Sequence, residues 1–240
     1  MLVVARTAVN AVEMSEVMSY GVLDYSEPSL AILEQMAERD GLSISITTKS
    51  NQVLRDIDLL KRSAERSRLS VNLSITTLRT RLARLLEPRA PRPDLRLEAV
   101  RALREAGISA GVLAMPIVPG ITDRAEDLDA LARGARDAQA QWFAGNVLFL
   151  MPASLKHFLP FLDSKFPKLS RQYREWYGRH GNAPDTYRKE ITARVENLRQ
   201  RYGLGSRPDR GENRSWKSPQ MQLGLGINQG GALCPARDPW

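Results

Sequence analysis

The sequence predicts an α/β fold, a partial barrel in which short parallel strands alternate with helices. Three strand-like segments end in polar residues, and they read SISITTKS (43–50), LSVNLSITT (69–77) and GVLAMPIVPGITD (111–123). Segments with helical spacing separate them, and this alternation is typical of right-handed βαβ crossovers in a parallel sheet. Polar groups that directly follow apolar strands indicate a ligand site at the rim of a βα barrel.

The regular pattern begins near Glu27, after a first segment without clear periodicity. An apolar stripe from Pro28 to Gly41 predicts the first helix, because proline suits an opening turn and glycine suits a helix end. Further helices are predicted at 51–67, 78–86, 95–106 and 123–138, with N-terminal caps at Asn51, Asp94 and Thr122. Strands are predicted at 43–48, 69–76, 109–115 and 142–150, with a fifth candidate at 2–5. This number is short of the eight strands of a closed barrel.

After Met151 the spacing of apolar residues is helical only, which predicts helices at 155–165, 170–180 and 185–202. We therefore divide the chain into four parts. These are a divergent or non-native segment (1–26), a partial βα barrel (27–152), a helical extension (153–203) and a disordered tail (204–240). The tail is rich in Gly, Pro, Asn, Gln and Arg, a composition that cannot build an apolar core.

The composition is that of an ordinary globular protein with a basic excess. The formal net charge is +8, from 35 Lys and Arg against 27 Asp and Glu. We favour a solvated, arginine-rich surface, and we keep a phosphate-facing surface for nucleic acid as the alternative. No apolar run reaches the ~20 residues that span a bilayer, so we expect no membrane segment. A single cysteine excludes an internal disulfide framework and fits a reducing cytoplasm.

The sequence contains no signature of a metal site or of a nucleophilic triad. His157 and His180 are the only histidines, and neither has a partner at metal-ligand spacing. No Ser-His-Asp or Cys-His arrangement is present. From these motifs we predict neither a catalytic residue nor a metal ligand.

Lys49 directly follows an apolar strand and is the strongest candidate for a site residue. A lysine at the mouth of a barrel can bind a carboxylate or phosphate, or form a Schiff base; the alternative is a solvated lysine that starts a loop. Ser74 and Thr76 lie at the corresponding tip of the next strand, and Asn72 shares a strand face with Ser74. A polar face in a parallel strand favours a polar cavity, although hydroxyl residues are common in any sheet.

Two further sets of residues could contact an anion or a nucleic acid. The proline-stiffened loop 86–93 carries Glu87, Arg89 and Arg92, and Arg89 could clamp an anionic ligand unless the loop is only a rigid connector. In the C-terminal helices, aromatic residues alternate with arginines and could stack on bases or simply pack between helices. The aromatic residues are Tyr173, Trp176, Tyr177 and Tyr187.

Four segments, in this order, resemble one family closely: ITTKS, LSITT, LEPRAPRPDLRLEAVRALREAGI and PIVPGITD. Between Pro28 and Gly203 the chain is similar to the radical S-adenosylmethionine proteins related to spore photoproduct lyase, often labelled DNA repair photolyases. The resemblance implies a partial (β/α)6 barrel with S-adenosylmethionine (SAM) bound across its strand tips. It also implies reductive cleavage of SAM to a 5′-deoxyadenosyl radical.

Carried over position by position, the resemblance implies a cofactor site at the strand tips. Lys49 and Ser74 would hold the methionine carboxylate, as a cation and a hydroxyl from neighbouring tips can do. The strand ends 114–118 and 149–151 would contact the adenosyl part. The implied cofactor-binding residues are Lys49, Ser74, Thr76, Met115 and Met151.

The sequence departs from this family in its cysteines. The family binds a [4Fe-4S] cluster through three cysteines of a CxxxCxxC loop, whereas the single cysteine here is Cys234. Because such clusters need thiolates, we expect a member that lacks the N-terminal third of its barrel and is inactive alone. Two other hypotheses stay open. One is a non-catalytic nucleic-acid-binding remnant that uses Arg171, Arg174 and Arg188; the other is an aldolase with Lys49 as Schiff-base nucleophile.

Overall fold

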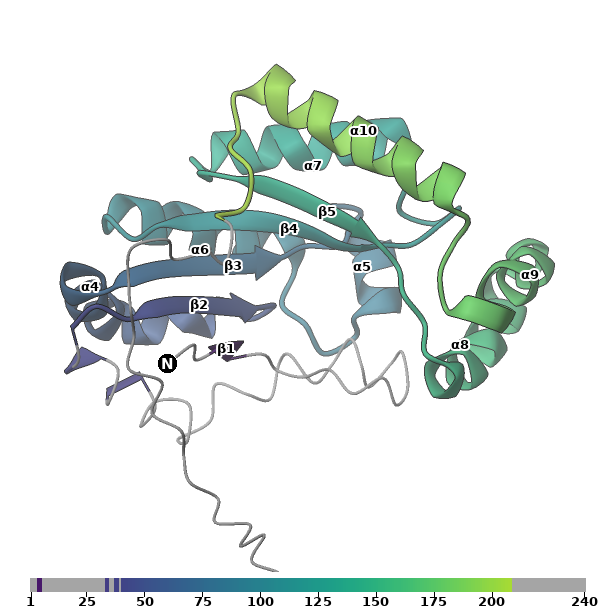
Figure 1. Ribbon diagram of the computed structural model, residues 1–240, viewed down its shortest axis with the longest axis horizontal. Helices are drawn as coiled ribbons and strands as arrows, with labels where there is room; N and C mark the ends of the chain where they lie inside the picture. The colour runs from purple at the N-terminus through teal and green to yellow at the C-terminus, as the bar shows by residue number, and fades with distance from the viewer. Residues whose placement is uncertain (1–3, 6–32, 35–36, 39, 209–240) are drawn as a thin grey trace, which may run out of the picture.

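A five-stranded parallel sheet forms the centre of the protein (Figure 1). The computed structural model describes residues 4–5, 33–34, 37–38 and 40–208, and the predictions for 1–3, 6–32 and 209–240, including Cys234, fall outside these residues. The sheet order is β1-β2-β3-β4-β5, so each strand pairs with the strand before it in the sequence. The strands are β1 (Val4–Ala5), β2 (Ser43–Thr48), β3 (Arg68–Ser74), β4 (Ala110–Ile117) and β5 (Phe143–Val147).

Helices connect the strands and cover one face of the sheet, which confirms the α/β partial barrel (Figure 1). Right-handed crossovers in a sheet of sequential order place their helices on the same side. Here α4, α6, α7 and α10 form this layer, and their apolar residues make one core with the strands. Their bounds are α4 (Ile57–Arg66), α6 (Pro93–Glu105), α7 (Ala125–Asp137) and α10 (Asp185–Tyr202). Among the described residues, no helix has both the length and the apolar character that crossing a membrane requires.

The strand register separates an apolar face from a polar face. Ile44 and Ile46 of β2 align with Leu69 and Val71 of β3, and all four side chains lie in the helix-covered core. Because side chains alternate along a strand, the intervening residues point to the opposite face. They include Ser45, Thr47, Asn72 and Ser74. The predicted polar face of β3 is therefore confirmed.

Asn72 is fully buried on this polar face and ties β3 to β2 and to Trp142, the residue before β5. Its Nδ2 donates to Ser45 Oγ at 3.2 Å and to the Ile46 carbonyl at 2.9 Å, while its Oδ1 accepts from Trp142 Nε1 at 3.1 Å. The Trp142 ring lies so close over Gly111 that a Cβ at Gly111 would come within 2.3 Å of it. The polar face of Asn72 was expected to line a cavity, but its amide is instead engaged in holding the sheet together.

A second apolar core lies beyond the carboxyl ends of the strands. It joins α5 (Thr80–Leu86), α8 (Pro152–Lys165) and α9 (Ser170–His180) to the segments that follow β4 and β5. Tyr173 and Tyr177 of α9 are buried in this core and anchor it by donating to the backbone carbonyls of Pro119 and Leu148. Two short 3-10 helices, η1 (Asn51–Asp56) and η2 (Pro167–Leu169), complete the elements within residues 40–208.

The predicted helix caps are wrong at three positions. Ser50, not Asn51, caps η1, because its Oγ accepts from the Gln52 amide at 3.1 Å. Asp94 lies inside the first turn of α6, since Pro93 already occupies a position that needs no amide hydrogen. Thr122 is buried and accepts from the Val118 amide at 2.8 Å, so it closes a turn before α7.

The C-terminal part departs from its prediction at two points. Helix α10 packs on β5 and α7 and belongs to the layer that covers the sheet. The tail was predicted to start at Leu204, but Leu204 is buried in the main core and Gly205 forms a parallel bridge with Trp142. A strand-like position therefore follows α10 at the edge of β5. The proposed domain boundaries otherwise stay predictions.

Candidate functional site

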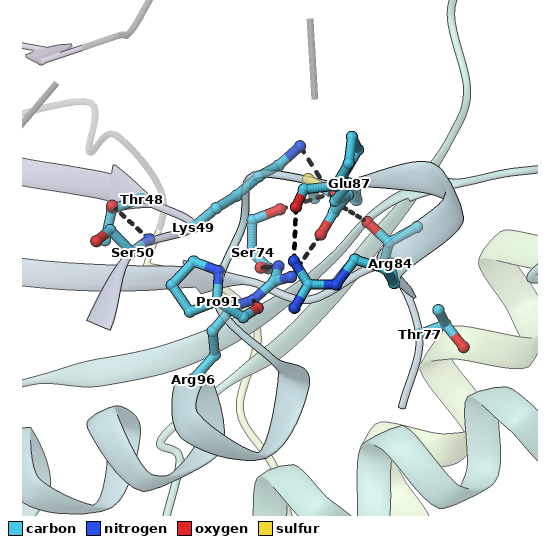
Figure 2. A network of polar contacts seen from close by, with 12 residues as sticks. Thr48, Lys49, Ser50, Ser74, Thr77, Arg84, Glu87, Pro91 and Arg96 are labelled. Carbon is cyan, nitrogen blue, oxygen red and sulfur yellow. Dashed lines mark hydrogen bonds and ion pairs between the residues drawn. The ribbon is translucent and has the colours of Figure 1, made fainter. Parts of the chain in front are cut away.

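The candidate site lies where β2 and β3 end. In a parallel sheet the carboxyl ends of neighbouring strands meet at one edge, and this edge carries ligand groups in βα barrels. Lys49 directly follows β2, while Ser74 ends β3 and Thr76 follows it. The side chains of Lys49 and Thr76 contact one network of polar groups, and Ser74 joins it through its backbone carbonyl (Figure 2).

Glu87 is the centre of this network. Its side chain is 1% exposed, at the end of α5. Arg96 Nη2 donates to Glu87 Oε2 at 2.6 Å, and Thr76 Oγ1 donates to Oε1 at 2.5 Å. Lys49 Nζ lies 3.3 Å from the same Oε1. Figure 2 shows Lys49 and Arg96 converging on this carboxylate from β2 and from α6.

The charge of Glu87 is stabilised by its partners. Burial alone would raise the pKa of Glu87, but the positive charges of Lys49 and Arg96 lower it. Hydrogen bonds from Thr76 and Arg96 lower the pKa further, and the net result lies below the ordinary value for glutamate. Glu87 is therefore an anion at neutral pH.

Arg96 links this carboxylate to the tip of β3. Its side chain is 1% exposed, and each of its three nitrogens donates to a protein oxygen. Nε donates to the Pro91 carbonyl at 2.9 Å, and Nη1 donates to the Ser74 carbonyl at 2.8 Å. Arg96 therefore acts as a buried brace between loop 86–93 and β3.

Ser74 and Met115 are joined across the strand tips. Ser74 Oγ donates to the Met115 carbonyl at 2.8 Å, which uses the single proton of the hydroxyl. A carboxylate ligand would therefore receive a hydrogen bond from Ser74 only after the hydroxyl turns away from Met115. Met151 stands outside this network, at the start of α8 with 51% of its surface exposed.

Other predicted residues are not drawn into the network. Arg89 and His157 are exposed, and Arg92 forms an ion pair with Asp94 at 2.5 Å. Among the described residues, no group of three or more His, Cys, Asp or Glu is arranged to hold a metal ion. Lys49 participates in an ion pair, whereas a Schiff-base nucleophile needs an uncharged amine, so the aldolase hypothesis gains no support.

The aromatic and arginine residues of the C-terminal helices are mostly engaged within the protein. The rings of Tyr173 and Tyr177 are buried and stacked at 5.2 Å, so they cannot stack on bases. Arg171 and Arg174 pair with carboxylates of α9 and α8, and Arg188 pairs with Asp185. The packing interpretation of these aromatic residues is thus confirmed for Tyr173 and Tyr177.

Arg96 is the site residue that the sequence analysis missed, although the sequence contains a signal for it. Arg96 precedes Ala99, Val100 and Leu103 at helical spacing, and all three are buried. A charged residue within the apolar stripe of a helix predicts a buried partner of opposite charge. Glu87, nine residues earlier, is that partner.

Residues 9–132, slightly more than half of the chain, match the radical SAM superfamily. An uncharacterized protein of Mycobacterium tuberculosis is 32% identical over 164 residues, which cover 68% of this chain and 48% of that protein. An uncharacterized protein of Acidianus two-tailed virus is 35% identical over 111 residues, 45% of this chain and 36% of the viral protein. The chain spans about half the length of the mycobacterial relative that it matches.

Solved structures of spore photoproduct lyase share the fold. A variant with bound AdoMet and dinucleoside spore photoproduct gives a TM-score of 0.56 at 22% identity, covering 77% of this chain and 56% of that chain. The enzyme complexed with dinucleoside spore photoproduct gives 0.53 at 21% identity, covering 73% and 53%. The similarity establishes a partial barrel of the same type. By its sequence match over more than half its length, together with this barrel, the chain belongs to the radical SAM superfamily.

Proposed function

We propose that the carboxyl edge of the sheet binds S-adenosylmethionine and that Lys49 is its principal polar contact. The observation that supports this most is the joining of two strand tips, β2 through Lys49 and β3 through Ser74 and Thr76, around one buried carboxylate. A solved relative in fold, spore photoproduct lyase, has bound AdoMet in one structure.

The residues at this edge fit the methionine part of SAM. The Lys49 ammonium would pair with the carboxylate, and Ser74 would supply a second donor after turning from Met115. Met115 and Met151 would contact the adenosyl part, and Thr76 would act through its bond to Glu87. When bound and reduced in this superfamily, SAM supplies a 5′-deoxyadenosyl radical.

A [4Fe-4S] cluster does not fit the residues of this sequence. The cluster of the family takes three thiolates, and the 240 residues contain one cysteine, Cys234. We therefore derive no reductive step from this chain. These residues would bind the cofactor. The class of activity to which they would belong is the lyase or DNA-repair activity of the family.

The test is calorimetric titration of the chain with SAM, in the wild type and in Lys49→Ala. A charge-assisted hydrogen bond is worth about 1.5–3 kcal/mol. Lys49→Ala should therefore lower the affinity for SAM at least about tenfold. Lys61→Ala is the matched control, because Lys61 is exposed on α4. Absence of SAM binding in the wild type, or equal affinity in Lys49→Ala, would overturn the proposal.

A nucleic-acid partner is the second candidate. The net charge of +8 favours it, and spore photoproduct lyase structures contain a dinucleoside spore photoproduct. Arg81 of α5 and Arg89 of the adjoining loop are exposed on either side of Glu87 in the sequence and could face a phosphate. Fluorescence anisotropy with a short DNA should show binding that weakens with salt and weakens further in R81A/R89A. A DNA affinity that does not change with salt concentration would rule out a nucleic-acid partner.

A further inference from the structure

Glu87 is held in place by groups other than Lys49. Arg96 occupies one carboxylate oxygen at 2.6 Å, and Thr76 occupies the other at 2.5 Å. The contact with Lys49 is the longest of the three, at 3.3 Å. The carboxylate would therefore keep its position if the lysine moved, whereas the lysine depends on the carboxylate for one of its contacts.

Arg96 ties this fixed carboxylate to the backbone of β3. The same guanidinium that pairs with Glu87 donates to the Ser74 carbonyl at 2.8 Å. With its three nitrogens engaged and 1% of its side chain exposed, Arg96 cannot turn toward a ligand at the rim. The cation of this network that faces the rim is thus Lys49, whose side chain is 13% exposed.

We propose that Glu87 is a positioning residue for Lys49. Arg96 braces Glu87, and Glu87 holds the lysine ammonium at a fixed place beside the tip of β3. An ammonium group has three donors, so Lys49 can keep Glu87 as a partner while it donates to an incoming carboxylate. The inference rests on the proposed function, in which that carboxylate belongs to SAM.

Positioning and simple charge compensation predict opposite results. If Glu87 only reduced the positive field of Lys49, removing its charge would strengthen the binding of an anionic group. If Glu87 positions Lys49, removing the charge or withdrawing the carboxylate by one methylene weakens that binding. Glu87→Gln tests the first change, and Glu87→Asp tests the second while keeping the charge.

The binding experiment compares SAM with 5′-methylthioadenosine, which lacks the methionine carboxylate. Both variants should bind SAM about tenfold more weakly than the wild type, the loss expected for one misplaced charge-assisted bond, with unchanged affinity for 5′-methylthioadenosine. Combining Glu87→Asp with Lys49→Ala should add little to Lys49→Ala alone, because both changes remove the same contact. Glu98→Gln, at an exposed carboxylate of α6, is the control and should leave both affinities unchanged.

Three outcomes would overturn the positioning role. These are tighter SAM binding in Glu87→Gln, equal loss of SAM and 5′-methylthioadenosine affinity, and full additivity with Lys49→Ala. Failure of the wild type to bind SAM would instead refute the proposed function. The positioning role can then be tested without any ligand, by measuring the rate at which an N-hydroxysuccinimide ester acetylates Lys49 with peptide mass spectrometry. Lys49 should react severalfold faster in Glu87→Gln while Lys61 is unchanged, and an unchanged Lys49 rate would refute the inference.

Discussion

Glu87 has 1% of its side chain exposed, and two cations and a hydroxyl offset the cost of its burial. The arrangement is sensitive to the loss of any partner, because a buried charge left without compensation costs several kcal/mol. This network around Glu87 could be predicted only in part from the sequence. Lys49, Ser74 and Thr76 could be placed at one edge from strand order, but Glu87 was seen only as a loop residue.

Glu87→Gln should reduce the free energy of unfolding by about 3–5 kcal/mol at neutral pH, since it breaks a buried ion pair. The pKa of Glu87 is lowered in the folded state, so its contribution is present above the ordinary glutamate pKa of about 4.3. The contribution is lost as the pH falls through the lower, folded-state pKa. Urea denaturation at neutral and at acid pH measures this.

The difference between wild type and Glu87→Gln should therefore shrink as the solution is acidified. Glu98→Gln again serves as the control, because an exposed carboxylate should show little effect at either pH. A difference that stays constant from neutral to strongly acid pH would show that the charge of Glu87 does not stabilise the fold.

In β4, Gly111 has no room for a side chain, because the Trp142 ring lies directly over it. Gly111→Ala would place a Cβ within 2.3 Å of a buried ring that Asn72 holds by a hydrogen bond. We expect a loss of about 1–3 kcal/mol in the free energy of unfolding. Gly178→Ala in α9 is the matched control, because its Cβ would meet nothing within 4 Å. That control should stabilise slightly, by up to about 1 kcal/mol.

The Asn72–Trp142 bond can be isolated by a double-mutant cycle. Trp142→Phe keeps an aromatic ring over Gly111 but removes the indole donor, and Asn72→Ala removes the acceptor. Each single change leaves a buried polar group without its partner and should cost about 1–3 kcal/mol. The two changes together should cost less than their sum by about 0.5–3 kcal/mol. Strict additivity of the unfolding free energies would mean that the bond contributes nothing.

The elements could largely be predicted, and their exceptions have physical causes. Alternating apolar residues fixed β2 at 43–48, and the helical stripes gave α9 and α10 with their bounds. The three caps were wrong for different local reasons. Ser50 caps η1 in place of Asn51, and Pro93 begins α6 one residue before Asp94. Thr122 uses its hydroxyl on the Val118 amide in the turn before α7. Residues 204 and 205 were assigned to a tail by composition, and composition cannot show that Leu204 is buried in the core or that Gly205 pairs with Trp142 at the edge of the sheet.

At the scale of the whole molecule, tyrosines join the second core to the sheet. Tyr173 and Tyr177 donate to backbone carbonyls, and Tyr187 of α10 donates to Asp123 at 2.6 Å. Burial raises the pKa of all three hydroxyls, and the bond to Asp123 raises that of Tyr187 further. The folded protein thus retains three protons that the unfolded chain releases near the ordinary tyrosine pKa.

The free energy of unfolding should therefore fall as the pH rises above about 10, where the unfolded chain binds fewer protons than the folded chain. Tyr173→Phe should cost about 1 kcal/mol at neutral pH, from its lost hydrogen bond. The same variant should lose stability less steeply above pH ~10, because one of the retained protons is gone. Denaturant titrations at neutral and alkaline pH test this, and parallel curves for the two proteins would contradict it.

The sequential strand order also has a consequence for how the chain folds. Each pairing closes only one βα unit, so β3 can join β2 before β4 or β5 has been synthesised, at a small cost in loop entropy. The exception is β5, since its cover, α10, comes from beyond two further helices, and Val195 of α10 packs against Gly145. A nascent chain that has reached α9 therefore exposes the apolar side of β5. During that interval the uncovered apolar strand is the kind of surface that chaperones bind and that can aggregate.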